Sequence, residues 1–268
     1  MMKKFALVLP ILVIFCAFSL LKMEKPTLYL IGDSTVADGS GHNGLWGWGK
    51  FLPIFFDSTK INIRNYAVGG TSTRTFQTNG VWDKNLNKLG MWDTVYSKLK
   101  KGDYLIIQFG LNDQSPVDDS TRSRGTLHGI SEDSVIILNK VTNEVETVHT
   151  FGWYMRRFIV LAKEKGATVI VCSSIPKNIW NDGKLIRGEY GFADWALQAA
   201  QQENTFTIDL NNRIANVYDK EGEAAVTTKY HIAKDNTHTI QAGSILNASI
   251  VVDGIRELKK CKLRKYLR

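Results

Sequence analysis

Residues 27–35 read Thr-Leu-Tyr-Leu-Ile-Gly-Asp-Ser-Thr. The short apolar run predicts a buried strand that ends at Gly32 and presents Ser34 at its carboxyl end. Because open α/β sheets bind their ligands at that edge, Ser34 is a candidate nucleophile, and its backbone N–H is a candidate donor to an oxyanion. Glycine, aspartate and serine also favour ordinary turns, so the tripeptide alone is equally consistent with a turn.

Further apolar runs follow along the chain at intervals that suit an α/β protein. They predict four more strands, at residues 61–66, 103–110, 168–173 and 205–210. Helices are predicted at residues 50–56, 153–165, 189–202 and 241–258, and a small hairpin at 135–138 and 144–148 within a long polar segment. Alternating strands and helices indicate a mostly parallel sheet, in which right-handed crossovers bring all the carboxyl ends to one edge.

The charge of the chain is concentrated at its ends. The 268 residues carry a formal charge of +8, but eight of the 34 basic residues lie in the first four or the last ten positions. The remaining 26 basic residues equal the 26 acidic ones. A nucleic-acid partner is therefore not expected, because it would require a basic face on the fold.

The N-terminus has the pattern of a secretory leader. Met1–Lys4 is short and positive, and residues 5–21 are almost wholly apolar. We therefore predict a signal peptide at residues 1–19, a single mature domain at 20–268, and a secreted or periplasmic protein without membrane contact after cleavage. An uncleaved membrane anchor is the alternative. Three distant cysteines indicate neither a disulfide framework nor a zinc site, and no metal or cofactor is expected.

Three later motifs offer the other parts that a nucleophilic serine needs. Gly70 follows the second predicted strand and can bring a second backbone N–H to the same edge. Asn112 follows the third strand and can donate its side-chain amide to an oxyanion, although either residue also suits a plain turn. His238 has the carboxylate of Asp235 three residues earlier, as a general base oriented by an acid requires.

The motifs together resemble the four blocks of the SGNH (GDSL) hydrolases. In chain order they are Gly32-Asp33-Ser34, Gly70, Gly110-x-Asn112-Asp113 and Asp235-x-x-His238. Details resemble the rhamnogalacturonan acetylesterase branch: Gly32-Asp33-Ser34-Thr35, Gly47-Trp48-Gly49, Ala67-Val68-Gly69-Gly70 with Arg74, and Asp235-Asn236-Thr237-His238-Thr239. One position departs from the branch, because Leu111 stands where a histidine is common. We expect that change to affect fine positioning and not the reaction.

The resemblance implies both a fold and a set of roles. The implied fold is a three-layer α/β/α sandwich with a five-stranded parallel sheet, of the flavodoxin-like kind. Ser34 would be the nucleophile, and His238 would act as base and then acid, oriented by Asp235. The oxyanion hole would consist of the backbone N–H groups of Ser34 and Gly70 and the side chain of Asn112.

These roles lead to a functional hypothesis. We expect a secreted serine esterase that removes O-acetyl groups from a plant cell-wall polysaccharide, with pectic rhamnogalacturonan as the polymer. Acetyl xylan or another acetylated sugar is the alternative substrate. An inactive carbohydrate-binding protein is the alternative from another class.

Substrate contacts are expected from arginine and tryptophan. Arg74, Arg122 and Arg124 are candidates to hold a galacturonate carboxylate, since a guanidinium binds a carboxylate in bidentate fashion. The alternative is that they pair structurally with nearby aspartates, at positions 113, 118 or 119. Of the two tryptophans at 46 and 48, one is expected in the core. Trp48 is the candidate to stack on a sugar ring.

Overall fold

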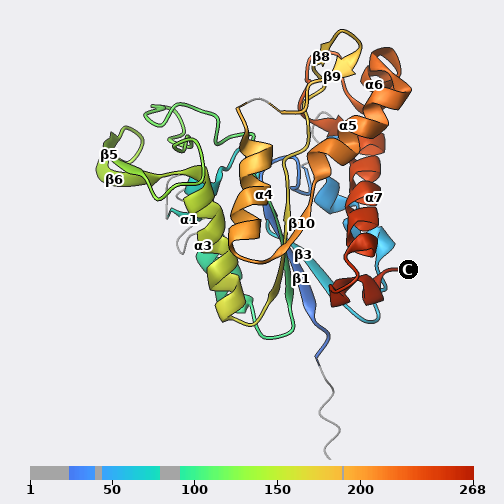
Figure 1. Ribbon diagram of the computed structural model, residues 1–268, viewed down its shortest axis with the longest axis horizontal. Coiled ribbons are helices and arrows are strands. Elements are labelled where there is room, and N and C mark those ends of the chain that lie inside the picture. Colours follow the sequence, from blue (N-terminus) through green and yellow to red (C-terminus); the bar gives the residue numbers. More distant parts are fainter. Residues whose placement is uncertain (1–23, 40–43, 79–90, 189) are drawn as a thin grey trace, which may run out of the picture.

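The computed structural model describes residues 24–39, 44–78, 91–188 and 190–268. A sheet of five parallel strands forms its centre (Figure 1): β1 (Thr27–Gly32), β3 (Asn62–Asn65), β4 (Tyr104–Gln108), β7 (Thr168–Cys172) and β10 (Phe206–Ile208). The strands lie in the order β10-β7-β4-β1-β3. All five predicted strands are confirmed, and their order is that of flavodoxin-like folds.

Helices cover both faces of the sheet (Figure 1). One face packs against α1 (Thr73–Gln77), α2 (Met91–Lys98), α3 (Phe151–Glu164) and α4 (Phe192–Gln202). The other packs against α5 (Leu210–Glu221) and α7 (Gln241–Glu257), with α6 (Glu223–Tyr230) beside them. Successive strand residues point to opposite faces, so Leu28 and Leu30 enter one core and Tyr29 and Ile31 the other. The predicted three-layer sandwich is confirmed.

Short elements complete the chain. Three two-stranded pairs are formed by β2 (Leu45–Trp46) with β11 (Thr239–Ile240), β5 (Ser134–Asn139) with β6 (Glu144–His149), and β8 (Trp180–Asn181) with β9 (Lys184–Leu185). The 3₁₀ turns are η2 (Trp48–Lys50), η3 (Leu52–Phe55) and η4 (Lys262–Tyr266). The predicted hairpin is present. The helix predicted at residues 50–56 is wrong, because η2 and η3 replace it; Pro53 lacks the N–H that a longer helix would use.

The predicted leader, residues 1–19, lies outside the described residues. Within the described ranges, every helix is too short or too polar to span a bilayer.

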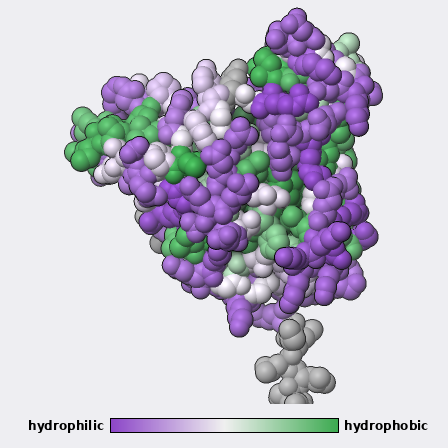
Figure 2. Space-filling model, viewed as in Figure 1, coloured by the Kyte–Doolittle hydropathy of each residue, from purple (hydrophilic) through white to green (hydrophobic). Residues whose placement is uncertain are grey.

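The β5–β6 hairpin has two unlike faces. Its outward face carries Ile136, Leu138 and Val145, which are 72%, 56% and 75% exposed. Figure 2 shows this apolar patch projecting at the left of the molecule. Strand alternation turns the neighbouring Glu146 to the inward face, toward α1.

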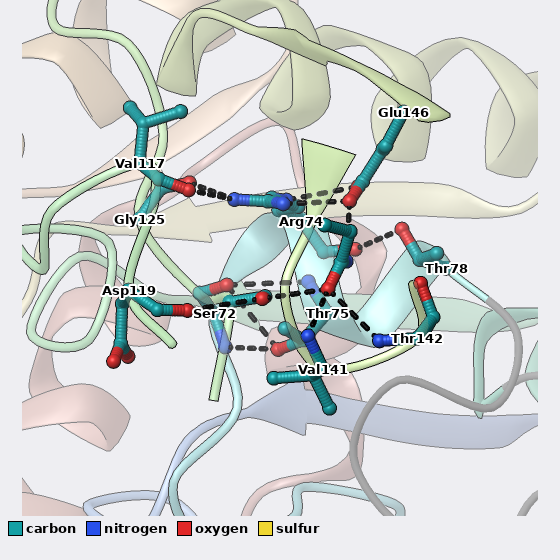
Figure 3. Close-up of polar contacts among 12 residues, drawn as sticks. Ser72, Arg74, Thr75, Thr78, Val117, Asp119, Gly125, Val141, Thr142 and Glu146 are labelled. Carbon is teal, nitrogen blue, oxygen red and sulfur yellow. Dashed lines mark hydrogen bonds and ion pairs between the residues drawn. The ribbon is translucent and has the colours of Figure 1, made fainter. Parts of the chain in front are cut away.

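Glu146 meets the buried guanidinium of Arg74, at the start of α1 (Figure 3). Arg74 Nε and Nη2 donate to Oε1 and Oε2 of Glu146 at 2.9 and 2.6 Å. Arg74 Nη1 donates to the backbone carbonyls of Val117 and Gly125, both at 2.9 Å. The Arg74 side chain is completely buried, so the expectation that it contacts substrate is wrong.

The network continues from Glu146 into the long loop after β4. Asn139 Nδ2 donates to Glu146 Oε2 at 2.7 Å, and Asn139 Oδ1 accepts from the Ser123 hydroxyl at 2.8 Å. The loop of residues 117–125 is therefore held at both ends by Arg74 and near its C-terminal end by Asn139. This loop carries Arg122 and Arg124.

We expect Arg74→Ala to lower the free energy of unfolding by about 3–5 kcal/mol, because it removes the cation that pairs with the Glu146 carboxylate and leaves two backbone carbonyls without a buried donor. Urea unfolding measures the change. Arg256→Ala is the matched control, since Arg256 pairs with Asp253 at the surface, where both side chains are half exposed. That control should stay within about 1 kcal/mol of the parent. Equal losses in the two variants would contradict a structural role for Arg74.

Candidate active site

A buried chain of hydrogen bonds holds the turn that carries Ser34. The carboxylate Oδ1 of Asp33 accepts from the backbone N–H and the hydroxyl of Thr35, at 2.9 and 2.7 Å. Gln108, at the end of β4, donates from Nε2 to the Thr35 hydroxyl at 2.7 Å. Trp48 Nε1 in turn donates to Gln108 Oε1 at 2.8 Å. The end of β1 is thereby tied to the end of β4.

This hydrogen-bond network places Trp48 in the core. Its ring is fully buried and its N–H is bonded, so the expectation that Trp48 stacks on a sugar is wrong. The flanking glycines let the turn approach the segment that follows Ser34. A Cβ at Gly47 would lie 2.3 Å from the Ala37 carbonyl oxygen, and one at Gly49 would lie 2.3 Å from that of Val36.

Ser34, His238 and Asp235 form a hydrogen-bonded relay. His238 Nε2 lies 2.8 Å from Ser34 Oγ, and His238 Nδ1 lies 2.8 Å from Asp235 Oδ2. The other carboxylate oxygen accepts from the backbone N–H groups of Thr237 and His238. Partial burial of Asp235 opposes ionisation, but these hydrogen bonds together lower its pKa. An ionised Asp235 favours a proton on Nδ1, which leaves Nε2 free to accept the serine proton.

Strand pairing brings His238 to Ser34 from 204 residues away. β11 follows His238 directly and pairs with β2, with Thr239 opposite Trp46. The backbone carbonyl of His238 also lies 3.1 Å from Nδ1 of the buried His231. The sequence motifs did not indicate His231, because its contact with His238 depends on how the loop folds and not on sequence spacing.

The residues predicted for the oxyanion hole line one pocket with His238. Ser34, Gly70, Asn112 and His238 all border it. Gly70 has φ of 79°, in the left-handed region that favours glycine. One N–H of the Asn112 amide donates to the Thr71 carbonyl at 2.8 Å. The pocket brings the three predicted donors together, and their action on an oxyanion stays a prediction.

A buried carboxyl lies next to Asn112. Burial raises the pKa of Asp113 to about 7, and the nearby Asp33 adds to the increase, although the backbone N–H and hydroxyl of Thr73 oppose it. Burial likewise raises the pKa of Asp33. A partly neutral Asp113 weakens the negative field that a developing oxyanion in the pocket would meet.

The cleft has two unlike arms that meet at Ser34 and His238. One arm is lined by Asp38, Leu45, Trp46, Val68 and Asp235. The other is lined by Leu111, Asn112, Arg122, Arg124 and Lys177. The first arm is therefore aromatic and acidic, and the second is cationic.

Some residues that line the two arms were predicted from the sequence as substrate contacts, and others were not. Arg122 and Arg124 border the cleft as the loop position predicts, and their role in binding stays a prediction. Trp46 borders the cleft in place of Trp48. Lys177 was missed, although its position shortly after β7 was a usable signal, since that strand ends at the same edge.

Leu111, which stands where the related branch has a histidine, has surroundings that are partly apolar and partly polar, because it borders both the cationic arm and a neighbouring cavity. It borders a small cavity with Ile175, Ile179 and Ile186, beside the cationic arm. A leucine side chain cannot form hydrogen bonds, so it takes no part in orienting its neighbour Asn112.

Comparisons with known proteins identify the family of this chain. A family model described as GDSL-like lipase/acylhydrolase matches residues 30–244. A rhamnogalacturonan acetylesterase from Emericella nidulans is 30% identical over 235 residues, which cover 88% of this chain and 85% of that protein.

Solved structures share the fold. The Bacillus subtilis protein YxiM has a TM-score of 0.68 at 24% identity, and the match covers 88% of this chain and 58% of that chain. Axe2, an acetylxylan esterase from Geobacillus stearothermophilus, has a TM-score of 0.55 at 17% identity, covering 86% of this chain and 94% of that chain. All four sequence blocks lie within the matched residues, and the chain belongs to the GDSL-like lipase/acylhydrolase family.

Proposed function

We propose that this protein is a secreted serine esterase that removes O-acetyl groups from an acidic plant cell-wall polysaccharide, with rhamnogalacturonan as the preferred polymer. The observation that carries the reaction is the relay of Ser34, His238 and Asp235, with 2.8 Å at each step. The similarity to a rhamnogalacturonan acetylesterase supports the substrate class. The apolar leader pattern at residues 1–19 supports secretion.

The reaction follows from the relay. Ser34 Oγ attacks the acetyl carbonyl carbon while His238 Nε2 takes the hydroxyl proton, and Asp235 stabilises the imidazolium that forms. The three predicted donors stabilise the tetrahedral oxyanion. Its collapse breaks the bond to the sugar oxygen, which receives the proton from His238. Water, activated by the same histidine, then cleaves the acetyl-enzyme to acetate and free Ser34.

The two arms of the cleft suit a polymer in which acidic and neutral sugars alternate. Arg122 and Lys177 on the cationic arm suit a galacturonate carboxylate, because charged hydrogen bonds to carboxylates are strong and directional. The partly buried ring of Trp46, which borders the other arm, suits the apolar face of a neutral sugar. A xylan main chain has no carboxylate. The shared fold with an acetylxylan esterase leaves acetyl xylan as the second candidate substrate.

We expect Ser34→Ala and His238→Ala each to lower kcat on p-nitrophenyl acetate by about 10⁴–10⁶, because a serine triad acts as a unit. Ser97→Ala is the matched control, since Ser97 is an exposed residue of α2. Circular dichroism verifies that each variant is folded. A folded Ser34→Ala variant with activity close to the parent would refute the nucleophile. If the parent protein were itself inactive, the alternative hypothesis of an inactive carbohydrate-binding protein would remain.

Acetate release compares the two candidate polymers. We expect faster release from acetylated rhamnogalacturonan than from acetylated xylan. Arg122→Ala, Lys177→Ala and added salt should each narrow the gap, because all three weaken attraction to carboxylates. Arg256→Ala, remote on α7, should leave the gap unchanged. Equal rates on both polymers, or a faster rate on xylan, would remove pectin from the proposal.

Trp46→Ala should raise KM for the polymer by about 3- to 10-fold, which corresponds to the ~1 kcal/mol of a ring contact, and should change small-ester turnover less. Trp48→Phe should instead lower the free energy of unfolding, because it removes the donor to Gln108. Initial-rate kinetics and urea unfolding measure the two effects. A polymer KM that responds to Trp48→Phe and not to Trp46→Ala would contradict this assignment.

A further inference from the structure

We propose that Arg124 is a positioning residue of the oxyanion hole, which orients and polarises the amide of Asn112 in place of binding a substrate carboxylate. The proposal rests on the ester hydrolysis proposed above. Arg124 Nη1 lies 2.8 Å from Asn112 Oδ1 and 3.5 Å from the Gly70 carbonyl oxygen. Arg124 Nε donates to the Ser115 hydroxyl at 3.1 Å. One half-buried guanidinium therefore touches two of the three residues predicted for the hole.

The contact selects one orientation of the Asn112 amide. A carboxamide accepts at its oxygen and donates from its nitrogen, whereas a guanidinium only donates. Arg124 therefore holds the oxygen, and Thr71 accepts one N–H of the amide nitrogen. A flipped amide would place NH₂ against the cation and oxygen against a carbonyl. In the part of the chain that the structure describes, the second N–H of Asn112 has no protein acceptor, so it can donate to substrate.

The positive charge also strengthens that donor. A cation bound to the amide oxygen draws electron density from the nitrogen, and charge-assisted hydrogen bonds are stronger than neutral ones. Arg124 also borders the pocket in which the oxyanion develops, so its charge lies close to that site. Groups that are fixed before the reaction stabilise such charge without reorganising.

The fold prepares Arg124 for this role. The next residue is Gly125, whose carbonyl is held by the buried Arg74. A Cβ at Gly125 would lie 2.0 Å from the Ser115 carbonyl oxygen, so the loop packs tightly against that segment. The backbone of Arg124 is thereby fixed from the core side. The side chain of Leu111 cannot form a hydrogen bond, so the orientation of the Asn112 amide depends on Arg124 and Thr71.

Turnover of p-nitrophenyl acetate tests the proposal, because this ester has no carboxylate or sugar for an arginine to bind. We expect Arg124→Gln to lower kcat by about 10- to 100-fold with KM within about twofold, as for weakening of one oxyanion donor. Arg124→Lys should lose less activity than Arg124→Gln, because lysine keeps the positive charge but lacks the planar set of guanidinium donors. Arg156→Gln is the control, since Arg156 is a half-buried arginine of α3 with its own partners.

A double-mutant cycle tests whether Arg124 acts through Asn112. In an Asn112→Ala background, Arg124→Gln should cost less than about threefold, because residues in one network are not additive. Active-site titration normalises each rate to folded enzyme. Additive losses, or unchanged p-nitrophenyl acetate turnover with a raised KM for the acidic polymer, would overturn the proposal. An inactive parent would overturn the ester hydrolysis and this inference together, whereas an active parent with insensitive Arg124 variants would overturn only this inference.

Discussion

The hydrogen bond from Gln108 to Thr35 is the contact on which the candidate active site depends. It spans 2.7 Å between the end of β4 and the turn after β1, in a region where neither residue is exposed. Buried polar groups without partners are costly, so this bond selects one geometry for both strand ends. Gln108 also accepts a hydrogen bond from Trp48, and Thr35 also donates one to Asp33. Ser34 is thereby presented to His238 from a rigid turn.

A second buried network performs the same task for the cationic arm. Arg74 and Glu146 form an ion pair that on its own contributes little net stability, because desolvation offsets much of the attraction. Its effect is on geometry, since the guanidinium also holds the loop of residues 117–125 at Val117 and Gly125. The loop then directs Arg124 back toward Asn112. One buried network therefore holds the turn that carries Ser34, and the other holds the loop that carries Arg124.

The structure changes how the arginines and tryptophans of this chain are interpreted. The candidates for substrate contact, on the grounds of residue type and of the loop that carries them, were Arg74, Arg122, Arg124 and Trp48. Arg74 and Trp48 are buried, whereas Trp46 and Arg122 border the cleft. Arg124 borders the cleft but is bonded to Asn112. Residue type therefore predicted correctly that arginine and tryptophan border the cleft, but it did not predict which arginines and which tryptophan do so.

The sequence by itself determined the five strands, their common carboxyl edge, and the serine, histidine and carboxylate that meet there. The strands depend on local apolar runs, and each motif is short in itself, as between Asp235 and His238. The pairing of Ser34 with His238, 204 residues apart, was expected from the resemblance of the ordered motifs to a known family. Only the tertiary structure decided the burial of Arg74, the hydrogen bond of Trp48 and the contact of Arg124 with Asn112. Arg74 pairs with a glutamate 72 residues away, and Trp48 with a glutamine 60 residues away. Such partners are set by how the elements pack in three dimensions, and local propensity contains no information about them.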